Sequence, residues 1–124
     1  MICLDTNHLI FALVAGSDEA RRLLAWADAG ERFCTSALAW YEFTCGPATA
    51  EQVAVVRNLL DEILPCDAAS AEAAARLFNA TGRRRNLRVD ALIAAAAIIR
   101  RVQLATRNRQ EFSVFQAHGL RLAD

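Results

Sequence analysis

The sequence contains no lysine, so its fourteen basic residues are all arginine. Fourteen acidic residues balance them, and the zero net charge does not by itself indicate a nucleic-acid partner. The charge is unevenly placed, however, because the first two-thirds of the chain is acidic and the last third is basic. This asymmetry favours an anionic partner, although a solvated arginine-rich face would give the same pattern. The basic residues of the last third include Arg83, Arg84, Arg85, Arg88, Arg100, Arg107 and Arg109.

The chain also lacks the cysteine and histidine patterns of zinc and redox sites. No cysteine pair has C-x-x-C spacing, and the two histidines, His8 and His118, are isolated. We therefore expect no zinc site, and we expect both histidines to be surface or capping residues. The cysteines have apolar neighbours and are expected to be small core residues in a reducing compartment. They are Cys3, Cys34, Cys45 and Cys66.

No segment has the features of a targeting signal or a membrane span. The N-terminus has no basic flank and carries an acid at position 5, which argues against a signal peptide. The longest apolar run, from Ala91 to Ile99, is too short to cross a bilayer. With 124 residues, 55% of them hydrophobic, the chain suits one packed domain over residues 1–124. A cytoplasmic location is the expectation.

Hydrophobic periodicity and capping residues divide the chain into alternating strands and helices. This alternation predicts an α/β fold with a short, mostly parallel sheet of about four or five strands flanked by about six helices. The apolar helix near the C-terminal third should be deeply buried. The expected strands cover residues 2–4, 32–35 and 102–106, with a strand or connection at 64–66 and an edge strand near Leu120 and Leu122. The expected helices cover residues 6–14 (capped by Thr6 or Asn7), 17–30, 36–44, 50–63, 68–79 and 90–101.

Three acidic residues lie in partly apolar settings near the predicted strand ends. Asp5 ends the first strand, Glu42 follows the second strand on a helix, and Asp90 begins the most apolar helix. Ligands of open α/β sheets bind outside the carboxyl ends of the strands. Carboxylates gathered there suit a hard cation such as Mg²⁺ or Mn²⁺. Thr106 ends a later strand, with Asn108 just beyond it.

Each acid also has a purely structural explanation. Asp5 could cap the following helix, and Asp90 could cap the apolar helix. Glu42, beside Trp40 and Tyr41, could pair with an arginine. Only the three together favour a cation site over these alternatives.

Four segments resemble, in order, the signature motifs of PIN domains. The resemblance spans essentially the whole chain and is closest to VapC-like toxins, which work with a VapB-like antitoxin. The segments are Ile2 to Ile10 with Asp5-Thr6-Asn7, Ser36 to Gly46 with Glu42, Val89 to Ala95 with Asp90, and Leu104 to Phe112 with Asn108 and Glu111.

The resemblance implies a three-layer PIN-like fold and a Mg²⁺- or Mn²⁺-dependent ribonuclease that acts as a toxin. It implies that Asp5, Glu42 and Asp90 are catalytic metal ligands. The fourth motif departs from the common pattern, because many members have Asp at both of the positions occupied here by Asn108 and Glu111. Asn108 can ligate through its amide oxygen, and Glu111 is the remaining catalytic acid. The residues expected to orient these ligands are Thr6, Asn7 and Thr106.

Substrate and partner expectations follow from charge and from the same resemblance. Trp40 or Tyr41 could stack on a base, but core packing is the expected role of both. VapC-like toxins form homodimers and bind an antitoxin, and the helices over 17–30 and 50–63 offer apolar surfaces for such contacts. The arginines placed to hold RNA beside the acids are Arg83, Arg84, Arg85, Arg88, Arg107 and Arg109.

Two other functions share part of this pattern. A phospho-acceptor receiver domain also has acids at strand ends, but it pairs two adjacent early acids and uses a late lysine. This chain has a single early Asp5 and no lysine. The second alternative is a catalytically weak or inactive PIN-like binding module, which the uncharged Asn108 keeps open.

Overall fold

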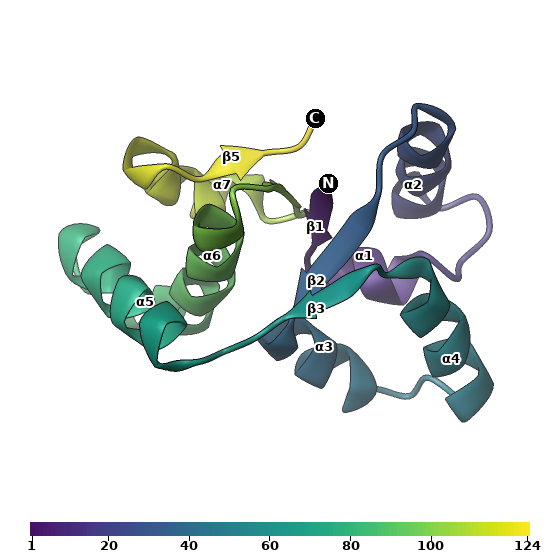
Figure 1. Ribbon diagram of the computed structural model, residues 1–124, viewed down its shortest axis with the longest axis horizontal. Helices are drawn as coiled ribbons and strands as arrows, with labels where there is room; N and C mark the ends of the chain where they lie inside the picture. The colour runs from purple at the N-terminus through teal and green to yellow at the C-terminus, as the bar shows by residue number, and fades with distance from the viewer.

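The protein is organised around a central sheet of five parallel strands in the order β3-β2-β1-β4-β5. The computed structural model describes residues 1–124 (Figure 1). In the register of the three central strands, Cys3 lies opposite Cys34 on one side and Leu104 on the other. The strands are β1 (Ile2–Leu4), β2 (Phe33–Ser36), β3 (Glu62–Leu64), β4 (Gln103–Ala105) and β5 (Arg121–Leu122).

Seven α-helices connect and cover the strands. Several begin at residues whose side chains accept a hydrogen bond from the first helical turn, as Ser17, Ser36 and Asp67 do. None of the helices has both the length and the apolar character needed to span a lipid bilayer. They are α1 (Thr6–Phe11), α2 (Asp18–Asp28), α3 (Ala37–Thr44), α4 (Ala50–Leu59), α5 (Ala68–Ala80), α6 (Arg88–Arg100) and α7 (Arg109–Phe112), with 3-10 turns at Arg85–Leu87 and Ser113–His118.

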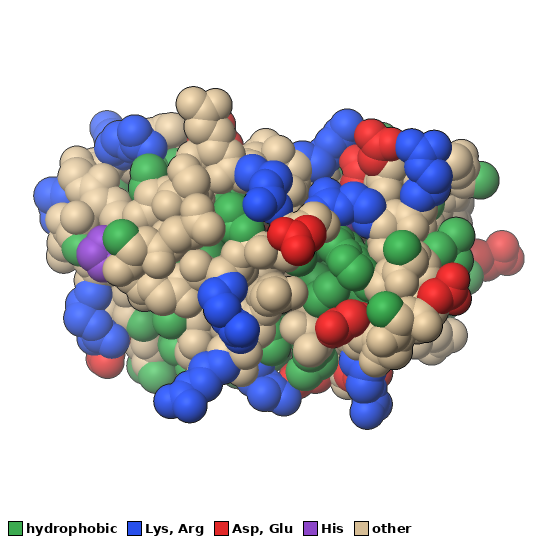
Figure 2. Space-filling model, turned by 90° about the horizontal axis from the view of Figure 1, so that it is seen from above, with side chains coloured by type: hydrophobic (Ala, Val, Ile, Leu, Met, Phe, Trp, Pro, Cys, Tyr) green, Lys and Arg blue, Asp and Glu red, His purple; other side chains and the backbone are tan.

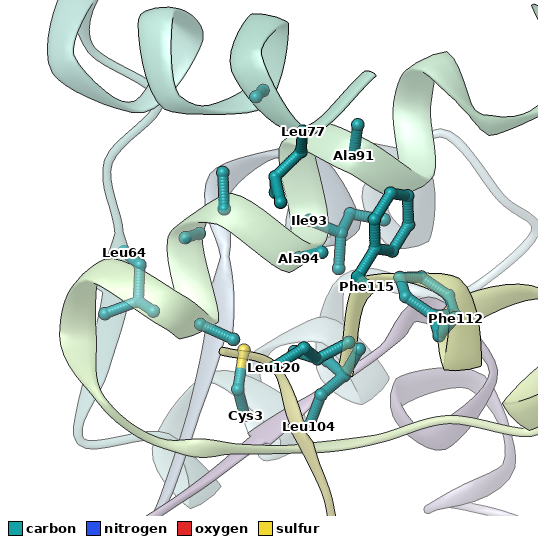
Figure 3. Close-up of a cluster of buried hydrophobic side chains, with 14 of the residues drawn as sticks. Cys3, Leu64, Leu77, Ala91, Ile93, Ala94, Leu104, Phe112, Phe115 and Leu120 are labelled. Atoms are coloured by element: carbon teal, nitrogen blue, oxygen red, sulfur yellow. The ribbon is translucent and has the colours of Figure 1, made fainter. Parts of the chain in front are cut away.

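The alternation of side chains along each strand divides the core into two layers. Cys3 of β1 belongs to a cluster with α5, α6 and α7, whereas its neighbours Ile2 and Leu4 belong to a cluster with α1 to α4. Figure 3 shows the first cluster, in which Phe112 and Phe115 lie near Ile93 of α6. The predicted three-layer α/β arrangement is therefore confirmed.

Helix α6 is the most deeply buried helix, as its composition predicts. Ala91 and residues 93–97 are all buried, and the small alanine side chains allow α6 to lie close to the sheet and to α5. This packing fixes the position of Asp90, which lies in the first turn of α6.

Several predicted boundaries were wrong, and the largest difference arises because local propensity does not include strand pairing. The helix predicted over 50–63 ends at Leu59, since Leu60 is extended and Glu62–Leu64 then pair with β2. The strand therefore lies earlier than the predicted 64–66. The helix predicted to reach residue 14 ends at Phe11, and its cap is Asp5 rather than Thr6 or Asn7. Asp90 does not cap α6, which begins two residues earlier.

Four predictions of burial were also wrong. Cys45 and Cys66 are exposed, so only Cys3 and Cys34 are core residues. His8 is fully buried rather than on the surface, because α2 covers α1 and places Trp26 against the imidazole. Tyr41 is 63% exposed, since its position on α3 faces away from the sheet.

Candidate active site

The strand order reverses between β1 and β4, and Asp5 and Thr106 follow these two strands directly. From β1 the chain proceeds outward to β2 and β3, and it then returns to β4 on the other side of β1. Such a switch point, at the carboxyl ends of parallel strands, is where open α/β sheets bind ligands. The backbone N–H of Asp5 donates to the carbonyl of Ala105 at 3.0 Å, which holds the two strand ends together.

Asp5 is held rigidly by two hydrogen bonds. Its carboxylate accepts from the Thr106 hydroxyl (Oγ1 to Oδ2, 2.8 Å) and from the backbone N–H of Thr6 (2.8 Å). Only 5% of Asp5 is exposed, and this burial raises the pKa of its carboxyl group, although the two hydrogen bonds act in the opposite direction. The negative charge of Glu42 raises the same pKa further. Asp5 thus caps α1 and also places a carboxyl group at the switch point.

Glu42 is connected to Asp5 through α1. The hydroxyl of Thr6 donates to Oε1 of Glu42 at 2.9 Å, while the backbone of Thr6 binds Asp5. Glu42 is exposed on α3 and forms no ion pair with an arginine. The structural explanation considered for Glu42, an arginine pair, is therefore wrong, and Thr6 aligns two acidic side chains.

Asp90 is brought to the same place by the buried helix α6. Burial raises the pKa of Asp90 to about 6, and repulsion from Asp5, Glu111 and Glu42 adds to the effect. The carboxyl groups at the start of α1 and on α3, α6 and α7 therefore lie close enough to repel one another. They belong to Asp5, Glu42, Asp90 and Glu111. A crowded group of acids that partly retains a proton is typical of a site that binds a cation.

The donor set fits a hard divalent cation, although the side chains do not yet converge on one point. All the candidate ligands are oxygens, as Mg²⁺ and Mn²⁺ prefer. No three acidic, histidine or cysteine side chains are close enough, as they stand, to hold one ion. Binding would therefore require side-chain rotation, which the exposed Glu42 and Glu111 allow.

The fourth motif surrounds the end of β4. Asn108 is exposed, and its backbone N–H donates to Oγ1 of Thr106 at 3.0 Å. Thr106 therefore links Asn108 to Asp5 and is fully buried in doing so. Glu111 follows on the short helix α7, and Asn7 is half-buried beside Thr6 on α1.

The predicted RNA-binding arginines differ in whether their side chains already have partners within the protein. Arg83 and Arg88 both lie over the ring of Phe78, at 5.4 and 5.7 Å. Arg84 and Arg85, between them in sequence, are exposed and have no ion-pair or aromatic partner in the protein.

Two further arginines support the loop after β4. Arg107 forms a 3.0 Å ion pair with Glu19, which is only 4% exposed, and lies over the ring of Phe11. Arg109 donates to the carbonyl of Ala123. Sequence reasoning missed the role of Glu19, because an acid in the first turn of a helix is usually a solvated residue.

The opposite end of the strands carries balanced charge. Arg100 pairs with Glu62 at 2.8 Å, and the N-terminal amine pairs with Glu31 at 3.3 Å. Figure 2 shows the face seen from above, where Figure 1 places both termini; arginine side chains are scattered over this face, and the acidic side chains lie mostly in its right half. Arg84 and Arg85, which have no ion-pair or aromatic partner, lie instead in the loop that leads into α6.

These observations define a three-layer α/β domain with an acidic site at the switch point of its parallel sheet. The model of the PIN domain family matches residues 2–117, and the chain belongs to this family. PIN domains are generally nucleases, and PIN nucleases generally use divalent metals.

Solved structures with the same fold are components of toxin–antitoxin complexes. A chain of a toxin–antitoxin complex from Klebsiella pneumoniae is 26% identical to this chain in sequence. The alignment covers 91% of each chain, with a TM-score of 0.72. FitAcB from Neisseria gonorrhoeae is 24% identical, covers 100% of this chain and 97% of that chain, and has a TM-score of 0.73. VapBC2 from Rickettsia felis, bound to a promoter DNA fragment, is 21% identical over 99% and 98% of the two chains, with a TM-score of 0.73. No curated protein matches the sequence.

Proposed function

We propose that the protein is a Mg²⁺- or Mn²⁺-dependent ribonuclease that acts in the cytoplasm as the toxin of a toxin–antitoxin pair. The observation that carries the proposal is the gathering of Asp5, Glu42, Asp90 and Glu111 at the switch point, with the pKa of Asp90 raised to about 6. Repulsion among these acids is relieved when a divalent cation binds. The Klebsiella and FitAcB structures support the toxin assignment through fold similarity.

In this proposal each acidic residue has a separate part. Asp5, oriented by Thr106 and Thr6, is the fixed ligand, whereas Glu42 and Asp90 approach from α3 and α6. When bound, the cation supplies a water of lowered pKa and stabilises charge on the scissile phosphate. Asn108 or Glu111 completes the site, and the exposed carboxylate of Glu111 can accept a proton from an attacking water.

Arginine residues must offset the repulsion between the acidic site and the RNA backbone. We infer that Arg84 and Arg85 make the main phosphate contacts, since no protein group occupies their guanidinium groups. Arg83, Arg88, Arg107 and Arg109 retain structural contacts that RNA binding would have to share or replace.

An antitoxin partner is supported by an apolar groove between α2 and α4. The groove has a volume of about 710 Å³ and is lined by the turn that follows α1 and by facing side chains of the two helices. Leu24 and Val55 on its walls are 66% and 58% exposed, so the groove presents adjoining apolar side chains to solvent. We propose that a VapB-like antitoxin segment covers this groove. Homodimer formation stays a prediction.

The proposed activity can be tested by RNA cleavage with antitoxin-free protein and Mn²⁺ or Mg²⁺. Wild type should cleave, while EDTA, Asp5→Asn and Asp90→Asn should abolish cleavage and leave the circular dichroism spectrum unchanged. Glu72→Gln, an exposed acid on α5, serves as the matched control and should cleave normally. Asn108→Asp should preserve or raise activity if residue 108 lies among the ligands.

Two results would contradict the proposal in different ways. Cleavage retained by Asp5→Asn would remove Asp5 from the site. Absence of both cleavage and metal binding in the wild type would instead favour the inactive binding module.

A further inference from the structure

A polar cavity adjoins the acidic site on the side of the arginine-rich loop. It is an open cavity of about 550 Å³ at the surface, and all its lining residues except Val114 are exposed. Two segments far apart in sequence form it, one at the 3-10 turn before α6 and the other running from α7 into the 3-10 turn that follows it. Its lining residues are Arg84, Asn86, Gln110, Glu111, Ser113 and Val114.

The cavity is continuous with the proposed catalytic centre through Glu111. This residue lines the cavity and is also one of the acids that raise the pKa of Asp90. A group bound in the cavity would therefore lie beside the acidic site rather than at a remote surface. Arg84, one of the two RNA-binding candidates without an ion-pair or aromatic partner, lies on the opposite segment of the lining.

The chemistry of the lining suits an unpaired nucleobase. The side-chain amides of Asn86 and Gln110 each offer both a donor and an acceptor, and neither has a hydrogen-bond partner within the protein. Amide side chains read base edges by paired hydrogen bonds, and sequence-specific RNA recognition targets unstacked bases of single strands. Val114 provides an apolar contact, and Arg84 can hold the phosphate of the same nucleotide.

We propose that this cavity binds the base of the nucleotide next to the scissile phosphate, so that Asn86 and Gln110 determine which sequences are cleaved. The inference rests on the proposed ribonuclease function and adds a specificity site to it. Arg84 supplies affinity without base choice, whereas the two amides supply base choice.

The test uses the full-length protein, Mn²⁺ and a pool of short single-stranded RNA oligonucleotides of randomised sequence, with the products sequenced. Wild type should prefer one base at a position adjacent to the cleaved bond. Asn86→Ala and Gln110→Ala should reduce that preference about fivefold or more, measured as the ratio of preferred to other bases among the products of the same pool. Arg84→Ala should slow cleavage of all sequences alike. Gln116→Ala, an exposed amide outside the cavity, should match wild type.

The outcomes separate this inference from the proposed function. Cleavage without any base preference, or a preference unchanged in both amide variants, would overturn the specificity site while leaving the nuclease intact. If wild type cleaves no RNA, the proposed function fails, and the cavity is judged by NMR titration with the four nucleoside 5′-monophosphates in EDTA. Saturable shifts of the Asn86 and Gln110 side-chain amides would support base binding, and unchanged resonances would refute it.

Discussion

Replacing Asp90 by asparagine should stabilise the metal-free protein at alkaline pH, even though it should abolish activity. Burial and the neighbouring carboxylates raise the pKa of Asp90 from 3.8 to about 6 in the folded state. The folded state therefore binds this proton more tightly than the unfolded state. The stabilisation by protonated Asp90 is complete below pH 3.8 and is lost as pH rises through 6. Above that pH, the ionised side chain opposes folding, and asparagine removes the opposition.

The size of the effect follows from the pKa difference. A difference of about two pH units corresponds to about 3 kcal/mol of unfolding free energy. Asp90 is only half-buried, so solvent screening reduces this to about 1–2 kcal/mol. Asparagine also loses a favourable interaction with the N-terminal end of α6, worth about 0.3–1 kcal/mol. We expect a net stabilisation of about 1 kcal/mol at pH 8 and none at pH 4.

Urea unfolding in EDTA at pH 4, 5, 6 and 8 would measure the difference between Asp90→Asn and wild type. Glu72→Gln controls for the loss of one exposed negative charge. Addition of Mn²⁺ at pH 8 should reverse the order, because the cation stabilises the wild type and not the variant. A difference that does not change with pH would refute the reasoning that crowded acids surround Asp90.

Two further predictions concern groups that support the site. His8 has no hydrogen-bond partner for either ring nitrogen, and burial, with Arg22 nearby, lowers its pKa to about 4. The neutral imidazole stabilises the fold above pH 6.5, and this contribution decreases as pH falls toward 4. The free energy of unfolding of wild type should therefore fall by about 2–3 kcal/mol over this range, and that of His8→Leu should not show this loss. Parallel pH profiles of the two proteins in urea unfolding would contradict the prediction. Thr106→Val removes the hydroxyl that binds Asp5 and Asn108, and it should reduce unfolding free energy by about 1–3 kcal/mol and cleavage about tenfold or more. Thr106→Ser should restore both, and Thr44→Val on the surface of α3 should change neither; equal losses in Thr106→Ser and Thr106→Val would exclude a role for the hydroxyl.

Local features of the sequence were sufficient to predict most helices, four of the strands, including the edge strand β5, and the depth of α6. Capping residues such as Ser17 and Ser36 act within one helical turn. The helix after Asp90 is apolar on all sides, so its burial can be predicted without knowing which elements cover it. The family motifs likewise placed the acidic residues in order along the chain. These signals are local, so they can be recognised without knowledge of the fold.

Only the tertiary structure decided what depends on contacts between distant segments. Strand pairing with β2 ended α4 at Leu59, and the cover of α2 buried His8, because neither partner is close in sequence. The same holds for the site. The sequence named Asp5, Glu42 and Asp90, but their mutual repulsion arises only where β1, α3 and α6 meet. The separation of the arginines into free and occupied groups depends in the same way on Phe78 and Glu19, which no sequence periodicity connects to them.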